Sequence, residues 1–530
     1  MRSEVRSDTV ADLGDAGRRI AGITCAEELA STGAHVVLLE AAGRIHQRAD
    51  DDALAGERAG EPFPLVRSRH RGFGGTSTHW TPATGLRVRP YDRVDFVARP
   101  GRPVDAWPVS LAALDPYYRR AHATIGVDPE YDPARWYGSA SPTPLAWAGG
   151  PQLAMFQFAP HDCFVDRFDR VVANPRIDLV LNASVERLEA SADASAVERV
   201  SVVARGGNHF GVAAGVVVLA CGGIDNARIL LCSPGRDGRS LGNEHDNVGR
   251  YFADHLSVDS GRLVPTGADV DPAVFERHRV DGSDYQPMLW LGNEMIEHAR
   301  LPNAAFWIYE ADPLFFSVAV GVARSVRAAS DMRGGVVRPG DALQLLRHSP
   351  GLLRFAARRV RRNAGAERMM ALRILIEQTP DRESRITLSD RRDELGIPRV
   401  KLDWRISNDD LAAVRAHQDL LAECLESRGV ATIADRFEPD EHIAPIMSNY
   451  HHIGSTRMHA DPRLGVVDHD GRVHATDNLY VLGSSTFTSG GYLNPTLTIL
   501  ALALRTADAI KAARRSVVVR AAAPGVGEGA

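Results

Sequence analysis

Two adjacent histidines, His451 and His452, lie near the carboxyl end of this 530-residue chain and are candidates for proton transfer. An imidazole titrates near neutral pH, so histidine can accept and release protons at working pH. No further ligands accompany the pair at metal-binding spacing, and the sequence therefore predicts no metal site. Only Lys401 and Lys511 are lysines among 62 basic residues, which effectively excludes amine catalysis. The indicated chemistry is acid–base catalysis by an imidazole.

A second candidate site begins near the amino end. Residues 20–43 predict a helix, a glycine turn and a buried strand that ends at Glu40. A strand–turn–helix–strand unit that ends in an acid is typical of dinucleotide binding. Gly17 and Gly22 fit the first and third glycine positions, but Arg19 replaces the middle glycine, which normally lets the backbone approach the pyrophosphate. This pattern alone does not distinguish a dinucleotide site from an ordinary β–α turn.

The elements that position these residues are spread along the whole chain. Residues 8–14, which precede the glycine turn, form a poor pattern for a buried strand. Strand and turn signals alternate over 176–233 and end in a helix, whereas 261–440 is mixed and predicts a separate lobe. A final helix is predicted over 495–514, because its proline suits a first-turn position.

Four ordered motifs carry a family resemblance. Residues 449–458, NYHHIGSTRM, and the sequence after them resemble the C-terminal signature of the glucose–methanol–choline (GMC) flavoprotein oxidoreductases. Gly72–Trp80 resembles the flavin-side glycine loop of that family, Val216–Leu231 its second nucleotide-domain strand and helix, and Asp246–His255 the short motif that follows. Within the family, the match is similar to the pyranose-oxidase-like and C-glycoside-oxidase-like bacterial branch.

The resemblance implies an α/β fold in which a Rossmann-like FAD-binding domain is interleaved with an α+β substrate domain built on an antiparallel sheet. We expect 1–95, 200–260 and 441–515 to form the FAD-binding domain. The segments 96–199 and 261–440 would form the substrate-binding domain, and 516–530 a flexible tail.

The resemblance also implies the reaction. Oxidation of a CH–OH group to a carbonyl requires loss of the hydroxyl proton and transfer of a hydride, which a flavin accepts at N5. By comparison with the family, His451 is the base and Asn494 the partner that binds the substrate oxygen. Asn494 precedes Pro495, so we expect it at the N-cap of the last helix.

The expected cofactor is FAD, and Ser77–Thr81 resembles the pyranose oxidase segment whose histidine carries FAD covalently. His79 is therefore a candidate covalent anchor. The residues expected to bind the cofactor are Gly17, Gly22, Glu40, Gly74, Gly75, Thr76, His79, Trp80, Thr81, Gly222, Gly483, Pro495 and Thr496.

Composition restricts the partners. A net charge of −5 provides no global basic field for nucleic acid. No apolar run reaches the roughly 18 residues of a membrane span, and no signal-peptide pattern opens the chain, so a cytoplasmic location is expected. The family resemblance implies a sugar, glycoside or other alcohol as substrate, with O2 or another electron acceptor reoxidising the flavin. The chain is a possible homo-oligomer.

Two alternatives stay open at this point. The family resemblance includes hydroxynitrile lyases, in which a histidine base works without flavin redox chemistry. Arg19 in place of a pyrophosphate-site glycine is also compatible with a cofactor-deficient, non-catalytic protein.

Overall fold

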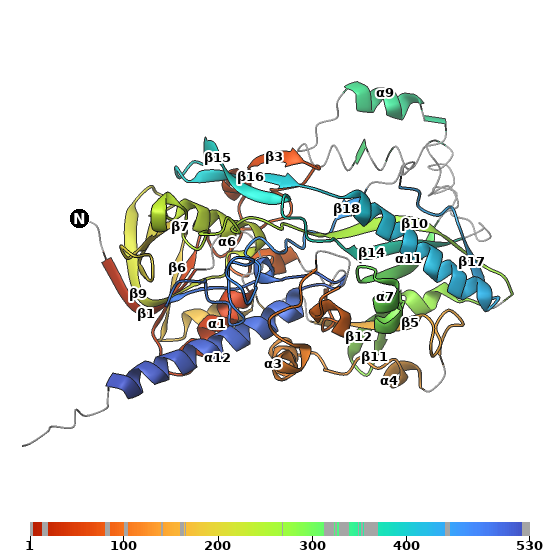
Figure 1. The fold of residues 1–530 in the computed structure, drawn as a ribbon, viewed down its shortest axis with the longest axis horizontal. Helices are drawn as coiled ribbons and strands as arrows, with labels where there is room; N and C mark the ends of the chain where they lie inside the picture. Colours follow the sequence, from red (N-terminus) through yellow and green to blue (C-terminus); the bar gives the residue numbers. More distant parts are fainter. Residues whose placement is uncertain are drawn as a thin grey trace, which may run out of the picture.

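The computed structural model describes residues 4–12, 20–79, 85–99, 104–138, 141–159, 164, 166–267, 269–311, 323, 326–327, 339–347, 349–350, 353, 369–439 and 446–521. For 4–12, 79 and 515–521 it describes only the backbone. Three β-sheets, with helices packed around them, build this part of the chain (Figure 1).

The first sheet has seven strands and is mainly parallel. Its order is β6 (Ile177–Leu181), β2 (Val36–Glu40), β1 (Glu4–Asp12), β9 (His209–Leu219), β8 (Val197–Ala204) and β7 (Ala183–Ala190), with β19 (Leu479–Val481) also paired to β9. Strands β6, β2, β1, β9 and β19 run parallel, whereas β7, β8 and β9 pair antiparallel. All five residues of β2 are buried, which is typical of a parallel strand covered on both faces.

The strand β1 corrects one expectation from the sequence. Residues 8–14 were a poor strand pattern, yet Glu4–Asp12 is a strand of nine residues. Thr9–Asp12 pairs with Val36–Leu39 on one side, and Glu4–Asp12 pairs with Gly211–Leu219 on the other. Two backbone ladders therefore stabilise a segment whose side chains predict a strand only weakly.

The second sheet has nine antiparallel strands. Its order is β17 (Ala431–Ala434), β10 (His255–Pro265), β14 (Met369–Glu377), β13 (Ala304–Ala311), β12 (Ser283–Trp290), β5 (Gln152–Ala159) and β4 (Leu86–Val88), while β11 (His278–Val280) pairs with β12 and β18 (Met447–Ser448) with β10. A third sheet contains β15 (Arg385–Arg392), β16 (Pro398–Trp404) and β3 (Glu57–Gly60). The parallel sheet beside an antiparallel one confirms the predicted α/β fold class.

Helices cover the sheets and connect them. The longer ones are α1 (Ile20–Ala30), α3 (Leu111–Ile125), α6 (Gly222–Cys232), α7 (Gly292–Ala299), α9 (Pro339–Arg347), α11 (Asn408–Ser427) and α12 (Thr496–Ala521). Shorter turns include α2 (Asp51–Leu54), α4 (Ala134–Tyr137), α5 (Arg167–Val172) and the 3-10 turns η2 (Gly75–His79) and η7 (Ser484–Thr486). Helix α12 packs against α1 and α3 (Figure 1).

The start of α11 shows how local sequence fixes an element. Ser407 Oγ accepts a hydrogen bond from the Asp410 amide at 3.1 Å, and Asp410 Oδ2 accepts one from the Ser407 amide at 2.9 Å. This capping box satisfies amides that the first turn would leave without partners.

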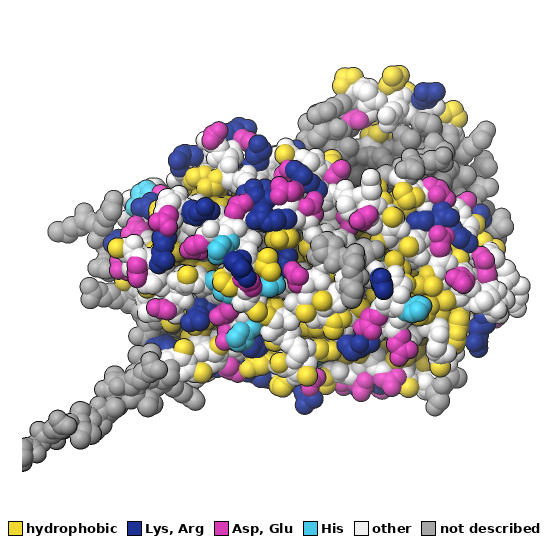
Figure 2. Space-filling model, viewed as in Figure 1, with side chains coloured by type: hydrophobic (Ala, Val, Ile, Leu, Met, Phe, Trp, Pro, Cys, Tyr) yellow, Lys and Arg dark blue, Asp and Glu magenta, His cyan; other side chains and the backbone are white. Residues whose placement is uncertain are grey.

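The segment 96–199 contributes to both large sheets. Strand β5 lies in the antiparallel sheet, whereas β6, β7 and the start of β8 lie in the mainly parallel one. The domain boundaries expected from the sequence stay a prediction. On the face shown in Figure 2, acidic and basic side chains are interspersed.

Candidate active site

The predicted base His451 lies on a short segment that pairs with β10 and the residues before it. β18 pairs antiparallel with β10, and the backbones of Ile453 and Ala253 exchange hydrogen bonds of 2.9 and 3.1 Å. Gly454 follows with φ +85°. A Cβ at Gly454 would lie 2.4 Å from the Tyr251 carbonyl oxygen, so this close approach requires glycine.

The Asp254 carboxylate fixes the backbone on both sides of this pairing. Its Oδ1 accepts hydrogen bonds from the amides of His255 at 2.7 Å and His451 at 2.8 Å. Its Oδ2 accepts from the Tyr450 amide at 3.1 Å and from Ser448 Oγ. Burial raises the pKa of Asp254 to about 6, against an ordinary value of 3.8, although these hydrogen bonds oppose the shift.

The imidazole of His451 lies between two polar partners. Its Nδ1 is 2.8 Å from Nδ1 of His255, and its Nε2 is 3.3 Å from Nδ2 of Asn494. The structure therefore brings together the two residues predicted to be catalytic, although 43 positions separate them. A substrate hydroxyl next to both atoms can donate to the imidazole and accept from the amide.

His255 and Asp254 contact the predicted base His451, although the sequence assigned them no role. His255 is buried, and its Nε2 lies 2.9 Å from the Gly490 carbonyl oxygen. The available signal was the acid–histidine pair that ends the motif Asp246–His255. Nothing in the sequence shows that this pair contacts a histidine 196 positions away.

His452, by contrast, points into the core. It is buried, and its ring lies 5.4 Å from that of Phe63 and 5.9 Å from that of Phe252. Its carbonyl oxygen accepts a hydrogen bond from Ser484 Oγ at 2.6 Å. A Cβ at Gly223 would lie 2.3 Å from the His452 Cβ, so α6 packs tightly against this residue.

The last helix begins slightly later than expected. Helix α12 begins at Thr496, which is buried, and the Pro495 carbonyl accepts the first helical hydrogen bond, from the Ile499 amide at 2.9 Å. Pro495 therefore occupies the capping position, and Asn494 lies one residue before it. The expectation that Asn494 is the N-cap is wrong by one position, which leaves its amide directed at His451 rather than at the helix.

Glu40 lies where the nucleotide pattern predicts, at the carboxyl end of β2, and it is buried. Its Oε1 accepts hydrogen bonds from the amides of Ala42 at 2.8 Å and Gly72 at 3.2 Å. Gly72 has φ +119°, and a Cβ there would lie 2.8 Å from the His46 nitrogen. The acid thus ties the flavin-side glycine loop to the first β–α unit, in which Gly22 is buried within α1.

The glycine loop continues into η2. Gly74 and Gly75 have φ of +88° and +56°. Ser77 Oγ donates to the Gly74 carbonyl at 2.6 Å, and Thr78 Oγ1 donates to the Gly75 carbonyl at 2.8 Å. These bonds close a tight turn in which Thr76 is half-buried.

Gly222 and Gly483 meet at the carboxyl ends of the parallel strands β9 and β19. Their φ angles are +87° and +108°, and a Cβ at Gly483 would lie 4.0 Å from the Gly222 Cα. Asn226 joins the two turns, because its Oδ1 accepts from the Cys221 amide at 2.7 Å and its Nδ2 donates to Ser485 Oγ at 2.8 Å. Glycine turns at this edge of a parallel sheet fit a dinucleotide, which binds at the carboxyl ends of such strands.

Some predicted residues lie outside the described part of the chain. These are Gly17, Arg19, Trp80 and Thr81, and for His79 only the backbone, at the end of η2, is described.

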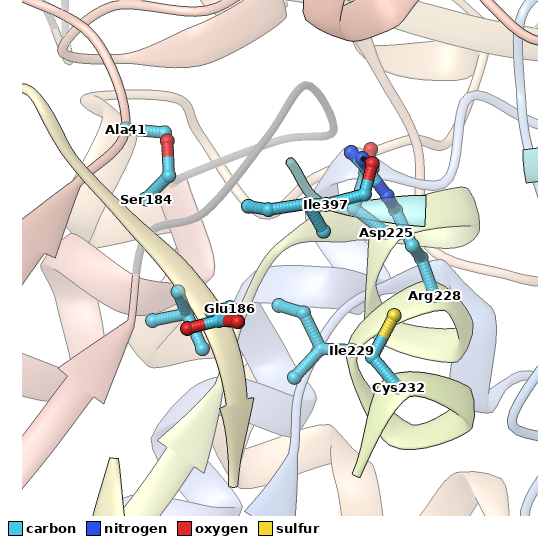
Figure 3. A pocket seen from close by; sticks show the side chains of 9 residues that line it. Ala41, Ser184, Glu186, Asp225, Arg228, Ile229, Cys232 and Ile397 are labelled. Atoms are coloured by element: carbon cyan, nitrogen blue, oxygen red, sulfur yellow. Dashed lines mark hydrogen bonds and ion pairs between the residues drawn. The ribbon is translucent and has the colours of Figure 1, made fainter. Parts of the chain in front are cut away.

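Next to α6, buried ion pairs tie three segments together. Arg69 Nη1 contacts the two carboxylate oxygens of Asp225 at 2.9 and 3.1 Å, and Arg228 contacts Asp393 at 2.7 Å. Figure 3 shows a small pocket in this region. It is lined by Ala41, Ser184, Val185, Glu186, Asp225, Arg228, Ile229, Cys232 and Ile397. These pairs connect α6 to the turn between β15 and β16 and to the segment before the glycine loop.

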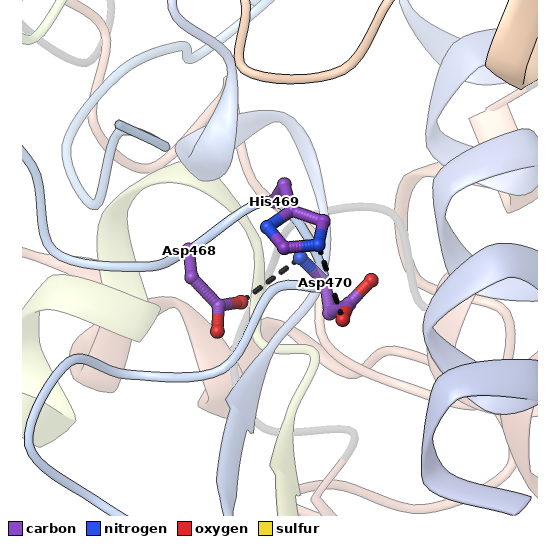
Figure 4. Close-up of side chains that lie close together, drawn as sticks. All are labelled: Asp468, His469 and Asp470. Carbon is purple, nitrogen blue, oxygen red and sulfur yellow. Dashed lines mark hydrogen bonds and ion pairs between the residues drawn. The ribbon is translucent and has the colours of Figure 1, made fainter. Parts of the chain in front are cut away.

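One group of possible metal ligands is found among the described residues. The ligand atoms of Asp468, His469 and Asp470 lie within 4.8 Å of one another (Figure 4). Asp468 Oδ1 already accepts from the amides of Asp470 at 2.9 Å and Arg472 at 3.0 Å, and Arg505 pairs with Asp470 at 2.8 Å. The group thus closes a turn beside α12.

Comparison with known proteins shows what this chain is similar to. Residues 380–503 match the family model of GMC oxidoreductase. The chain is 27% identical over 564 residues to 6'''-hydroxyparomomycin C oxidase of Streptomyces lividus, covering 95% of this chain and 92% of that relative. It is 24% identical over 490 residues to the fructose dehydrogenase large subunit of Gluconobacter japonicus, covering 83% of this chain and 80% of the relative.

The crystal structure of pyridoxine 4-oxidase from Mesorbium loti has a similar fold. It matches with a TM-score of 0.51 at 17% identity, covering 96% of this chain and 99% of that one. The carboxyl region is thus similar to GMC oxidoreductases, which bind FAD, and the chain has the fold expected of that family. Among the described residues, no helix is both long and apolar enough to cross a membrane.

Proposed function

We propose that this protein uses FAD to oxidise a CH–OH group of a sugar, glycoside or other polyol to a carbonyl, with His451 as the base. The observation that carries the proposal is the distance of 3.3 Å between His451 Nε2 and Asn494 Nδ2. One substrate oxygen can contact both atoms, and that oxygen must lose a proton as the carbonyl forms.

The roles of the side chains follow from their hydrogen-bonding capacity. His451 takes the hydroxyl proton at Nε2. The Asn494 amide donates a hydrogen bond to the same oxygen, which stabilises negative charge as it develops. Asp254 holds the His451 backbone in place through the 2.8 Å hydrogen bond to its amide. When bound, FAD supplies the acceptor for the hydride.

We assign the cofactor to the edge of the mainly parallel sheet. Glu40, the loop at Gly74–Gly75, and the paired turns at Gly222 and Gly483 are the described residues that would hold it. The positive φ angles of these glycines support this assignment, because they let the backbone approach a ligand closely. We further propose His79 as a covalent anchor, on the basis of the Ser77–Thr81 resemblance.

The relatives support the substrate class. One is named for the dehydrogenation of fructose and another for the oxidation of a hydroxyparomomycin, so a sugar-type hydroxyl is a reasonable first substrate. Because one name denotes an oxidase and the other a dehydrogenase, peroxide should be measured during turnover. Its formation would identify O2 as the acceptor.

Two measurements test the proposal. The absorbance spectrum of the purified protein, before and after acid precipitation, should show flavin, and flavin that stays with the precipitate would show covalent attachment. Anaerobic mixing with sugars, polyols and alcohols should then bleach the flavin absorbance. If none of these compounds bleaches it, the proposed function is wrong.

Replacement of the base gives a sharper result. His451→Gln should slow flavin reduction by roughly 10²- to 10⁴-fold while flavin content is unchanged, since general-base catalysis contributes about that much. His35→Gln, at a half-exposed histidine of the first β–α unit, is the matched control. Equal rates in the two variants would contradict the role of His451. Turnover by flavin-free protein would instead favour a lyase, and colourless protein that takes up no FAD would favour the cofactor-deficient alternative.

A further inference from the structure

A continuous chain of hydrogen bonds runs behind the proposed base. It connects Asn494 Nδ2 to His451 Nε2 at 3.3 Å, His451 Nδ1 to His255 Nδ1 at 2.8 Å, and His255 Nε2 to the Gly490 carbonyl oxygen at 2.9 Å. We propose that His255 is a positioning residue that sets the tautomer of His451, so that Nε2 is the nitrogen that takes the substrate proton. This inference rests on the proposed function.

The direction of each hydrogen bond follows from the groups at the two ends of the series. A carbonyl oxygen only accepts, so Nε2 of His255 carries a proton and donates it to Gly490. A neutral imidazole has one donor and one acceptor nitrogen, so Nδ1 of His255 accepts from Nδ1 of His451. The second nitrogen of His451, Nε2, is then an acceptor.

The Asn494 end of this series of hydrogen bonds requires the same proton positions. The amide nitrogen of Asn494 only donates, and it faces Nε2 of His451. Nε2 must therefore carry a lone pair, as the argument from Gly490 also requires. Two independent groups thus specify one tautomer.

The Gly490 carbonyl is itself held rigidly. The Gly490 amide donates to Glu377 Oε1 at 3.0 Å, and the buried Arg99 pairs with Glu377. A Cβ at Gly490 would lie 3.1 Å from His255 Nε2, so the close packing of loop and imidazole favours glycine. Among the described residues, His255 contacts the titratable side chains of His451 and, at its amide, Asp254, and Glu377 accepts from the Gly490 amide.

When His451 takes up a proton, the other hydrogen bonds of this series need no rearrangement. When Nε2 of His451 takes the substrate proton, Nδ1 keeps its own proton and continues to donate to His255. The cation that forms is therefore stabilised by a hydrogen bond already in place, since hydrogen bonding to the charged form favours it. If His255 instead carried a proton on Nδ1, it would compete with His451 for this bond.

Two variants of similar shape test the role. Asn at position 255 places a neutral amide oxygen near the site of Nδ1 and can accept from His451, whereas Leu occupies the same space without an acceptor. His255→Leu should lower the rate constant of flavin reduction at saturating substrate on the order of 100-fold, a typical loss for an impaired general base. His255→Asn should stay within about 10-fold of the wild type by the same scale. Equal rates in the two variants would reduce His255 to a packing residue and overturn the inference.

A measurement without turnover decides the tautomer directly. In protein labelled with ¹⁵N-histidine, the ring signals can be assigned from their loss in His451→Gln and His255→Asn. We expect the proton of His451 on Nδ1 and a coupling through the hydrogen bond between the two Nδ1 atoms. A proton on Nε2 of His451 would refute the inference, and this wild-type readout still decides if His255→Leu fails to fold.

The two failures can be distinguished. If no CH–OH donor reduces the flavin of the wild type, the proposed function fails while the ¹⁵N spectrum still reports the tautomer. If the wild type reduces its flavin but Leu and Asn variants behave alike, only the role of His255 fails.

Discussion

Replacing Asp254 by asparagine should separate stability from activity. The fold raises the pKa of this buried carboxyl to about 6 from 3.8. Between these two pH values the folded protein therefore binds more protons at this group than the unfolded chain does. The free energy of unfolding of the wild type consequently falls as pH rises through this window. At neutral pH the buried charge destabilises the fold, and Asp254→Asn removes that charge.

The magnitude follows from the two pKa values. A difference of about 2 units corresponds to about 3 kcal/mol over the whole window, and roughly half of this falls between pH 5 and pH 8. Removing the charge therefore stabilises the variant, but a hydrogen-bonding loss opposes this effect. The side-chain amide in Asp254→Asn has only one accepting oxygen, so the Tyr450 N–H or the Ser448 hydroxyl loses its carboxylate partner. A lost buried hydrogen bond costs about 1–3 kcal/mol. At pH 7 we therefore expect the variant to be within about 2 kcal/mol of the wild type, since the two effects nearly cancel.

Activity should respond differently. Oδ1 and Oδ2 of Asp254 hold the backbone at the proposed base, through the amides of His451 and Tyr450. A small displacement of a catalytic group costs up to about 100-fold. We expect flavin reduction to slow by about 10- to 100-fold on that scale, with flavin content unchanged.

The assay is urea unfolding followed by tryptophan fluorescence at several pH values from 5 to 8, with Asp237→Asn at an exposed position as the control. The stability of Asp254→Asn relative to wild type should increase with pH by about 1–2 kcal/mol over this range, whatever the constant cost of the lost hydrogen bond. The control should show no such trend. A relative stability that is flat or decreases with pH would refute the argument from burial. Unchanged flavin reduction would refute the argument from positioning.

Three further predictions concern the surroundings of the site. Asp225→Asn should lower the free energy of unfolding, measured by urea denaturation, by about 3–5 kcal/mol, because it leaves the buried guanidinium of Arg69 without its anion. A decrease below about 1 kcal/mol would contradict this. Gly223→Ala should cost about 1–3 kcal/mol, since its Cβ would overlap His452, whereas Gly206→Ala has open space and should cost less than about 0.5 kcal/mol. Burial raises the pKa of the Cys25 thiol to about 12, so brief alkylation followed by mass spectrometry should find Cys25 modified only after unfolding.

Contacts between distant residues were predictable from the sequence where both residues belong to recognisable motifs. His451 and Asn494 come together because each belongs to a recognisable segment of the carboxyl region, and Glu40 ends its strand where the nucleotide pattern requires. The fold class was predictable for the same reason, because the four ordered motifs carry the family resemblance that implies it.

Other features depend on packing that no local pattern contains. His255 reaches His451 through the pairing of β10 with β18, which side-chain periodicity does not specify. Strand β1 forms because both of its neighbours are present, although its own side chains favour a strand only weakly. The position of Asn494 one residue before the helix cap is a matter of backbone geometry, and sequence places helix ends with an uncertainty of a residue or two.

The pairing order of the mainly parallel sheet has a consequence for biosynthesis. Strand β1 at the amino end pairs with β9, and β9 in turn pairs with β19 at residues 479–481. During synthesis, β1 cannot pair with β9 until residues 209–219 have been made, and β9 cannot pair with β19 until residues 479–481 have been made. Contacts of such long sequence separation slow folding, and they expose unpaired strand edges in the meantime. His451 and Asn494 can therefore meet only after residue 494 has been synthesised. We expect this protein to depend on protection by chaperones more than a chain with local pairing does.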